Sequence, residues 1–237
     1  MARIYRDYGS DLYLLYTTLR LSQREICAFR PATGYPCQVV EFTFVLIKMN
    51  LLGLATGDVK TMAREPQIAE VLEKHRGEKH LVVLHNYPDP DAISAAFAHK
   101  LISAQYDIDV DILYSGKISH GQNIALVKLL GIDLIPYKDG MDLSGYQGAV
   151  FLDHQGATAN GIVKALEAAR IPVLVIVDHH EPQSVVKATY SDIQKTGSTA
   201  TIYAHYLMQD ILPLQKGQKE HVAMATALMH GLLSDTG

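Results

Sequence analysis

An apolar run passes directly into an acidic, proline-rich loop at residues 81–91, which read LVVLHNYPDPD. Four consecutive apolar residues that end at a turn signal are typical of a strand buried on both faces, as in a parallel sheet. In an open α/β sheet, ligands bind beyond the carboxyl ends of the strands. The stretch therefore predicts an α/β fold, and it predicts the edge of the sheet at which the polar side chains of the loop act.

Two further apolar runs end in the same way. Residues 148–152 (GAVFL) run into the pair DH, and residues 173–177 (VLVIV) run into the triplet DHH. Strands that alternate with segments of helical length indicate βαβ units, and hence a mostly parallel β-sheet flanked by helices. We expect strands near 81–84, 110–114, 149–152 and 173–177, an edge strand at 132–136, and helices near 61–75, 92–105, 122–130, 161–169, 198–208 and 219–233.

Residues 1–60 differ in character from the rest of the chain. Helical patterns at 11–21 and 39–54 flank a stretch interrupted by proline and glycine, and neither pattern carries a chemical motif. We therefore predict a small helical N-terminal segment of unknown role, followed by a single α/β domain at 61–237.

The composition indicates a globular protein that can bury a sizeable core. Of the 237 residues, 48% are hydrophobic and 19% are charged. The net charge of -4 disfavours binding to long duplex nucleic acid. Two cysteines without a C-x-x-C pair indicate a reduced, cytoplasmic protein with no disulfide framework. The most apolar stretch, 39–55, carries Glu41 and Lys48 and is short for a bilayer span, so we expect a buried helix and no membrane contact.

The first acidic loop carries the pattern H-x3-D-x-D at His85, Asp89 and Asp91. Its two prolines are expected to keep both aspartates extended and outside the helix that follows. Since residues two apart in an extended segment point the same way, Asp89 and Asp91 can then serve two neighbouring ions. The alternative is a turn in which Asp91 is the N-cap of the helix.

The DHH triplet places two imidazoles side by side. Adjacent side chains of an extended chain point to opposite sides, so one of His179 and His180 can bind a metal while the other meets a substrate. Asp178 can supply the hydrogen bond that fixes the tautomer of a ligating histidine. Asp153 taken alone is also explained by a helix cap or an Asx-turn, and His154 is interpreted as a neighbour rather than a ligand.

A fourth acid, Asp235, follows an apolar helix predicted at 222–233. An acid just beyond a helix C-terminus is unfavourable with the helix dipole, and a cation partner would offset this cost. A solvated chain end is the alternative interpretation. If the four acidic clusters converge on one edge of the sheet, they require cations, because carboxylates removed from water repel one another.

Four motifs in this order, HNYPDPDAIS, FLDH, VDHH and LLSDTG, resemble those of the DHH phosphoesterase family over about residues 65–237. The first motif is similar to that of the oligoribonuclease and 3'-phosphoadenosine-5'-phosphate phosphatase branch, and also to that of the manganese pyrophosphatases. The resemblance implies two divalent metal ions, with Mn²⁺ favoured over Mg²⁺, Co²⁺ or Fe²⁺. Carboxylate and imidazole ligands agree with that choice of metal.

The resemblance also implies a role for individual side chains. The implied metal ligands are six carboxylates and imidazoles, namely His85 and Asp89 for the first ion, Asp91, His179 and Asp235 for the second, and Asp153 as a bridge between both. At the catalytic positions, His180 would stabilise the charge that develops on the phosphoryl group. Asp178 would support the imidazole of His180.

A Gly- and Ser-rich loop at 115–123 follows the second expected strand. His120 and Asn123 in this loop are predicted to contact the substrate, although a plain helix-entry loop explains them as well. At 197–199 we favour helix capping over donation of backbone N–H groups to a phosphate.

The expected activity is that of a nanoRNase-like exonuclease or phosphatase, in which a hydroxide activated by two metal ions attacks phosphorus. Its substrates would be short oligonucleotides, linear or cyclic dinucleotides, or 3'-phosphoadenosine-5'-phosphate. A manganese-dependent inorganic pyrophosphatase and a non-catalytic nucleotide-sensing module are the alternatives. Members of the family usually carry a C-terminal substrate-binding domain after the fourth motif. We expect this domain to be absent here, through truncation in the first instance or in a natural short form as the alternative. The expected partner is a small phosphate ester, and a homodimer is left open.

Overall fold

The computed structural model describes residues 67–183, 185–215 and 217–236. Within these residues six strands form one sheet in the order β3-β2-β1-β4-β5-β6, and every neighbouring pair is parallel. The strands are β1 (Lys79–Leu84), β2 (Asp109–Tyr114), β3 (Ile135–Pro136), β4 (Gly148–Leu152), β5 (Val173–Asp178) and β6 (Tyr190–Ile193). The predicted α/β fold with a parallel sheet is confirmed.

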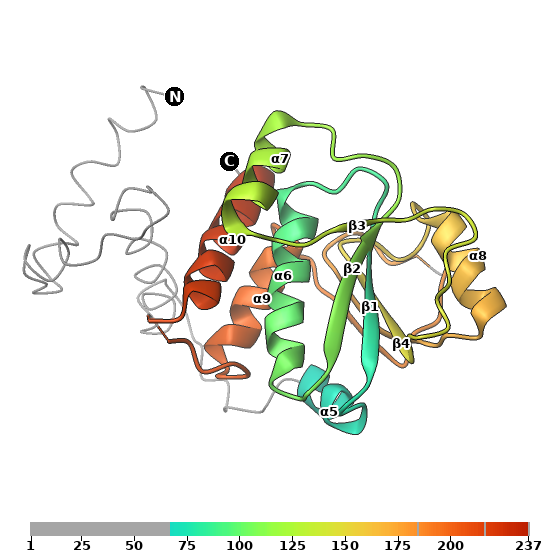
Figure 1. Ribbon diagram of the computed structural model, residues 1–237. Helices are drawn as coiled ribbons and strands as arrows, with labels where there is room; N and C mark the ends of the chain where they lie inside the picture. The colour runs from blue at the N-terminus through green and yellow to red at the C-terminus, as the bar shows by residue number, and fades with distance from the viewer. Residues whose placement is uncertain (1–66, 184, 216, 237) are drawn as a thin grey trace, which may run out of the picture.

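Helices cover both faces of this sheet (Figure 1). They are α5 (Gln67–Lys74), α6 (Pro90–Ala104), α7 (Gly121–Leu130), α8 (Asn160–Ala169), α9 (Thr199–Met208) and α10 (Lys219–Thr236). Helices α6, α9 and α10 lie on one face, and α8 lies on the other. Helix α5 lies at the end of the sheet where β1 begins.

Alternate residues of β1 explain why both faces are covered. Val82 and Leu84 belong to the core that also contains residues of α6, α9 and α10, whereas Leu81 and Val83 belong to a second core on the α8 side. All four side chains are fully buried. Because successive side chains of a strand point to opposite faces, a continuous apolar run is what a strand between two helical layers requires.

The boundaries of two helices differ from the sequence prediction. Asp91 lies in the first turn of α6 and not in an extended loop before it, because Pro90 occupies the first helical position. A proline is favoured there, since its φ is preset for the helix and its missing N–H has no intrahelical partner to lose. At the other end of the chain α10 continues to Thr236, so Asp235 lies within its last turn and not beyond it.

Most of the predicted N-terminal segment lies outside the described residues. This holds for the helices expected at 11–21 and 39–54, for the apolar stretch 39–55 and for the first part of the helix expected at 61–75. The described part of that last helix is α5. Among the described residues, no helix combines the length and apolarity needed to cross a membrane.

The order of the strands reverses between β1 and β4, which pair with each other in the middle of the sheet. In doubly wound sheets a crevice opens beyond the carboxyl ends of the strands at such a point. His85 directly follows β1, and Asp153 directly follows β4. The topology therefore brings the first two polar motifs to one place.

Candidate metal centre

Asp153 lies at the middle of the polar groups that the strand ends bring together. Asp153 is only 4% exposed, and its backbone adopts a left-handed conformation with φ of 62°. Aspartate and asparagine enter this region more readily than other non-glycine residues. The backbone N–H of Asp153 donates to the carbonyl of Val177 on the neighbouring strand β5. The turn is thereby fixed, and the carboxylate points into the crevice.

One group of ligand-type side chains joins the loop after β1 to Asp153. The Nε2 atom of His85 lies 3.9 Å from Oδ1 of Asp89 and 3.7 Å from Oδ2 of Asp153. One atom from each of these three side chains lies within 4.8 Å of the other two, close enough for a shared ion. The structure thus brings together the two ligands implied for the first ion and the implied bridge.

A second group surrounds the imidazole of His179. Its Nε2 atom lies 3.8 Å from Oδ2 of Asp91, 3.4 Å from Oδ1 of Asp153 and 3.5 Å from Oδ2 of Asp235. The Nδ1 atom faces the carbonyl of Thr196 at 3.3 Å. A proton on Nδ1 satisfies that carbonyl and leaves the lone pair of Nε2 directed at the carboxylates.

The same Nε2 atom provides a test of whether these residues fit a metal ion. It is buried and has no hydrogen-bond partner among the described residues, although three carboxylate oxygens surround it. Buried polar atoms are normally paired, and an exception requires a physical cause such as an ion. Imidazole nitrogen with carboxylate oxygen is a donor set that divalent transition metals accept. The residues therefore fit a divalent cation.

Electrostatics lead to the same conclusion. Burial raises the pKa of Asp153 well above its ordinary value, and the charges of Asp91 and Asp89 raise it further. Burial also raises the pKa of Asp91 to about 6, although the N–H groups of Ala200 and Thr199 act in the opposite direction. Charged carboxylates nearby oppose the ionisation of both groups, and a cation among them removes that opposition.

Two helix N-termini hold the first-motif aspartates. Asp89 is the N-cap of α6 and accepts from the backbone N–H of Ala92 at 3.0 Å, so Asp89 and not Asp91 caps this helix. Asp91 instead accepts from the first backbone N–H groups of α9, those of Thr199 and Ala200, at 2.7 Å each. These N–H groups orient a carboxylate of the centre, and Ser198 caps α9 as expected.

The approach of α10 to α6 brings Asp235 within reach of His179. Gly231 lies one turn before Asp235, and a Cβ atom on it would lie 2.3 Å from Oγ of Ser94 and 3.1 Å from the carbonyl oxygen of Pro90. A glycine is therefore needed where the two helices meet. Because α10 continues through Asp235, the helix itself aims this carboxylate at the centre.

The other residues of the DHH triplet form a hydrogen-bonded unit at the side of the centre. Oδ1 of Asp178 accepts from Nδ1 of His180 at 2.8 Å and from the backbone N–H groups of both histidines. Oδ2 of Asp178 accepts from Nε2 of Gln155 at 2.7 Å. Asp178 is fully buried, whereas the His180 side chain is 51% exposed. The imidazole of His180 is thus held through Nδ1, its ring centroid lies 4.3 Å from that of His179, and about half of the side chain is exposed to solvent.

Two contributors were not identified from the sequence. The hydroxyl of Thr199 donates to Oδ1 of Asp153 at 3.0 Å, and the buried side chain of Gln155 links the loop after β4 to the DHH triplet. Gln155 stands next to the FLDH motif, and Thr199 belongs to the stretch 197–199, for which the sequence favoured helix capping. His154 is a neighbour, as interpreted, because Nε2 contacts the carbonyl of Val83 and Nδ1 accepts from the N–H of Gly156.

The structure does not bring the two predicted substrate contacts into the ligand groups. Asn123 is buried, and its amide donates to the carbonyl of Pro88 at 3.3 Å, which anchors the first-motif loop to α7. His120 is the exposed N-cap of α7 and makes no side-chain capping bond. Their contact with a substrate stays a prediction.

Residues 79–232 match the family described as DHH family, N-terminal domain, so the chain belongs to the DHH family. It is 36% identical over 170 residues to the uncharacterized protein MJ1633 of Methanocaldococcus jannaschii. This match covers 70% of this chain and 32% of that protein. It is 24% identical over 161 residues to a probable manganese-dependent inorganic pyrophosphatase of Streptococcus mutans. This second match covers 67% of this chain and 48% of that protein. The chain thus spans about half, or less, of the length of these curated relatives.

A solved structure also resembles this chain. It is that of an exopolyphosphatase-related protein from Bacteroides fragilis, with 16% sequence identity and a TM-score of 0.48. The match covers 77% of this chain and 52% of that chain.

Proposed function

We propose that this chain is the metal-binding domain of a phosphoesterase that hydrolyses short nucleotide phosphate esters with two divalent cations. The favoured cation is Mn²⁺. The observation that carries the proposal is the position of Asp153 between two imidazoles. One of its oxygens lies 3.7 Å from Nε2 of His85, and the other lies 3.4 Å from Nε2 of His179. A single carboxylate in that position suits a bridge between two ions.

Six side chains would hold the ions, in the two groups described above. His85 and Asp89 would bind one cation, Asp91, His179 and Asp235 would bind the other, and Asp153 would bind both. When bound, two such cations supply a nucleophilic hydroxide near neutral pH and offset the charge of the phosphoryl oxygens. The probable manganese-dependent pyrophosphatase among the relatives supports Mn²⁺ as the first metal to test.

His180, positioned by Asp178, would act on the phosphoryl group from the side of the centre. With Nδ1–H of His180 held by Oδ1 of Asp178 at 2.8 Å, a proton on the other ring nitrogen, Nε2, would be presented to the substrate. A donor held in advance toward the oxygen on which charge develops stabilises the transition state without having to reorganise. Asp178 does not touch the substrate in this arrangement and acts by positioning the imidazole.

A cavity whose lining includes Asn86, the residue after His85, supports a nucleotide rather than a bare phosphate as the substrate. It has a volume of about 310 Å³, and the loops after β1, β2, β3 and β4 all line it. Tyr87 and Tyr137 contribute aromatic rings to this cavity, and Asn86 and Ser115 contribute polar groups. Tyr87 is 62% exposed. Exposed aromatic rings stack on nucleobases, and amide and hydroxyl groups can hydrogen-bond to sugar or base edges.

One alternative enzyme function has an observation in its favour. The similarity to a probable manganese-dependent inorganic pyrophosphatase supports pyrophosphate as a substrate. The two functions share the metal centre and differ in their use of the cavity. Pyrophosphate has no aromatic or sugar portion for Tyr87 and Tyr137 to contact, so replacing Tyr87 separates the two.

The test is a Mn²⁺-supplemented assay of the gene product against short RNAs, the linear dinucleotide pApA, cyclic dinucleotides, 3'-phosphoadenosine-5'-phosphate and pyrophosphate. We expect cleavage of at least one nucleotide, an activity that Asp153→Asn abolishes and that Tyr87→Ala weakens through KM. Release of phosphate from pyrophosphate alone, unchanged in Tyr87→Ala, would establish the alternative. Nucleotide binding without any hydrolysis, in protein with Mn²⁺ bound, would favour a sensing module.

A further inference from the structure

A second cluster of metal-ligating side chains lies at the opposite end of β1 from the metal centre. His75 directly follows α5, Glu78 directly precedes β1, and His80 is the second residue of that strand. His80 and His85 are five residues apart along an extended strand, which corresponds to about 17 Å. The cluster is therefore separate from the site at the carboxyl ends of the strands, and it was not recognised in the sequence.

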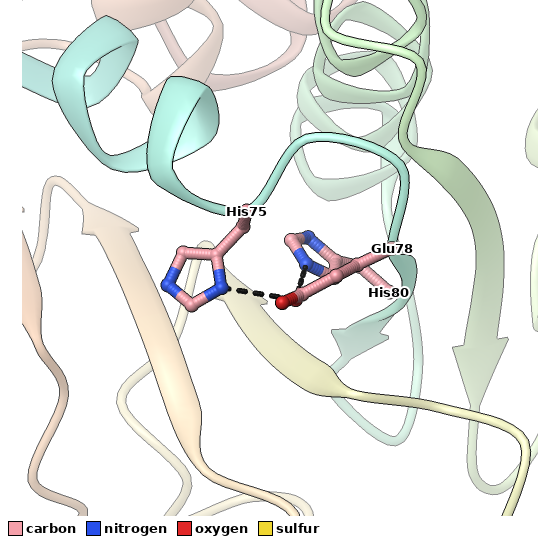
Figure 2. Close-up of side chains that lie close together, drawn as sticks. All are labelled: His75, Glu78 and His80. Carbon is pink, nitrogen blue, oxygen red and sulfur yellow. Dashed lines mark hydrogen bonds and ion pairs between the residues drawn. The ribbon is translucent and has the colours of Figure 1, made fainter.

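Figure 2 shows that both imidazoles converge on the Glu78 carboxylate. Nδ1 of His75 lies 2.9 Å from Oε2 of Glu78, and Nε2 of His80 lies 3.0 Å from the same oxygen. One ligand atom from each of the three side chains lies within 4.8 Å of the other two. The rings are inclined at 67° with their centroids 5.8 Å apart, so they approach the carboxylate from different directions.

The burial of the cluster is uneven in a way that suits an ion. His80 is 1% exposed, and its Nδ1 atom has no partner among the described residues, so the ring's polar contact is directed at the cluster. The side chains of His75 and Glu78 are 25% and 31% exposed. One ligand is thus buried in the interior, while the other two are partly exposed to the solvent that would supply a cation and a water molecule.

Neighbouring positive side chains are engaged elsewhere. Nζ of Lys79 lies 2.8 Å from a carboxylate oxygen of Asp111, on the other face of the strand end. The guanidinium of Arg76 pairs with Glu73 and Asp107. Among the described residues, the side-chain partners of the Glu78 carboxylate are therefore the two imidazoles alone. Two neutral imidazoles and one carboxylate carry a net negative charge that a divalent cation would offset.

The geometry points to a second cation site, in which His75, Glu78 and His80 bind one Zn²⁺-type ion with water as the fourth ligand. Two imidazoles and a carboxylate form an established donor set for zinc, with ligand distances of about 2.0–2.2 Å. Each imidazole nitrogen lies 2.9–3.0 Å from Oε2 of Glu78, and one ligand atom of each residue lies within 4.8 Å of the others, so small side-chain movements would bring all three to one ion. The ion would fasten the end of α5 to the first strand of the sheet, which indicates a structural role.

Binding has a defined proton balance. In the metal-free cluster both imidazoles can donate to Oε2 of Glu78. When Nδ1 of His75 and Nε2 of His80 coordinate an ion, each neutral ring carries its proton on the other nitrogen. For His80 that nitrogen is the buried Nδ1, which has no partner among the described residues. We therefore expect weaker affinity than in a closed site with four protein ligands.

The experiment counts zinc bound to the whole chain after equilibrium dialysis, for the unmodified protein and for His75→Ala, Glu78→Gln and His205→Ala. His205 is an exposed histidine of α9 outside every ligand group found among the described residues, and it serves as the matched control. We expect His75→Ala and Glu78→Gln each to bind one equivalent fewer than the unmodified protein and the control. Circular dichroism of each variant establishes that the fold is retained.

A second measurement on the unmodified protein does not depend on variants. Anomalous diffraction at the zinc edge from a Zn²⁺-soaked crystal should give a peak between the ring nitrogens of His75 and His80 and the Glu78 carboxylate. Equal zinc content in all four proteins, or no peak at this position, would overturn the proposal and leave a hydrogen-bonded cluster. Both readouts count bound metal and are independent of phosphoester hydrolysis.

Discussion

Asp153 and His179 come from the ends of neighbouring strands, and Oδ1 of Asp153 lies 3.4 Å from Nε2 of His179. The hydroxyl of Thr199 donates to the same carboxylate oxygen. The other oxygen of Asp153 faces His85 at 3.7 Å. Because this carboxylate belongs to both ligand groups, its replacement should disturb both.

Asp153→Asn tests this directly, since asparagine tolerates the left-handed backbone of the position, with φ of 62°. We expect loss of bound Mn²⁺ and a fall in hydrolysis of more than about a hundredfold, because loss of a supporting residue alone costs about 10–100-fold at metal sites. Metal content by mass spectrometry and initial rates are the measurements. Asp133→Asn, at an exposed position outside the ligand groups, is the control and should retain both properties.

The stabilising effect of Mn²⁺ should increase with pH. Burial raises the pKa of Asp91 from its ordinary 3.8 to about 6. A carboxyl with a raised pKa holds its proton in the folded state after the unfolded chain has lost it. The free energy of unfolding of the metal-free protein therefore falls as pH rises from about 4 to about 6.

Bound Mn²⁺ replaces the proton and removes this loss, so the difference in Tm between metal-saturated and metal-free protein should be larger at pH 7.5 than at pH 5. Scanning calorimetry at both pH values measures it. Because both Tm values are measured at the same pH, the effects of titrating groups away from the centre cancel in the difference. A difference that is constant across this range would contradict the assignment of Asp91 as a ligand.

Gly231→Ala should weaken the centre from a distance. The added Cβ would meet Ser94 at 2.3 Å and the Pro90 carbonyl at 3.1 Å, which forces α10 away from α6 and carries Asp235 with it. We expect a loss of about 1–3 kcal/mol in the free energy of unfolding, which is typical of overpacking. We also expect weaker binding of the Mn²⁺ ion that Asp235 would hold. Denaturant titration and isothermal calorimetry measure the two effects.

Gly121→Ala is the control for that substitution. A Cβ at Gly121 meets nothing within 4 Å, so stability and metal binding should be unchanged there. If Gly231→Ala binds both ions with unchanged affinity, the position of α10 does not govern the placement of Asp235.

Asp178→Asn should reduce kcat by about 10–100-fold while Mn²⁺ content is retained, because Asp178 holds the imidazole of His180 and lies in neither ligand group. A double-mutant cycle with His180→Ala separates positioning from a general structural effect. The double variant should be no slower than His180→Ala alone, since the two residues act as a unit. Additive losses would show that Asp178 acts by another route.

The sequence was sufficient to predict the parallel sheet, because the short, fully apolar runs that become β1, β4 and β5 each end at a polar turn, as strands buried on both faces do. It was also sufficient to group the polar residues that follow these strands, since parallel strands present their carboxyl ends at one edge. The boundaries of the helices were harder to predict from the sequence. Pro90 was interpreted as a barrier to the helix, whereas it initiates α6 and places Asp91 in the first turn.

Contacts between distant segments were not predictable from local pattern. The pairing of Asp91 with the first N–H groups of α9 joins residues more than a hundred positions apart. The requirement for Gly231 depends on how closely α10 crosses α6. The cluster of His75, Glu78 and His80 is local in the sequence, but it depends on the turn between the end of α5 and the start of β1.

The most direct test of the metal centre is anomalous diffraction at the manganese edge from a Mn²⁺-soaked crystal of the protein. We expect two peaks about 3.5–4 Å apart, both within bonding distance of the Asp153 carboxylate, with His85 on one ion and His179 on the other. A single peak, or two peaks that do not share Asp153, would contradict it.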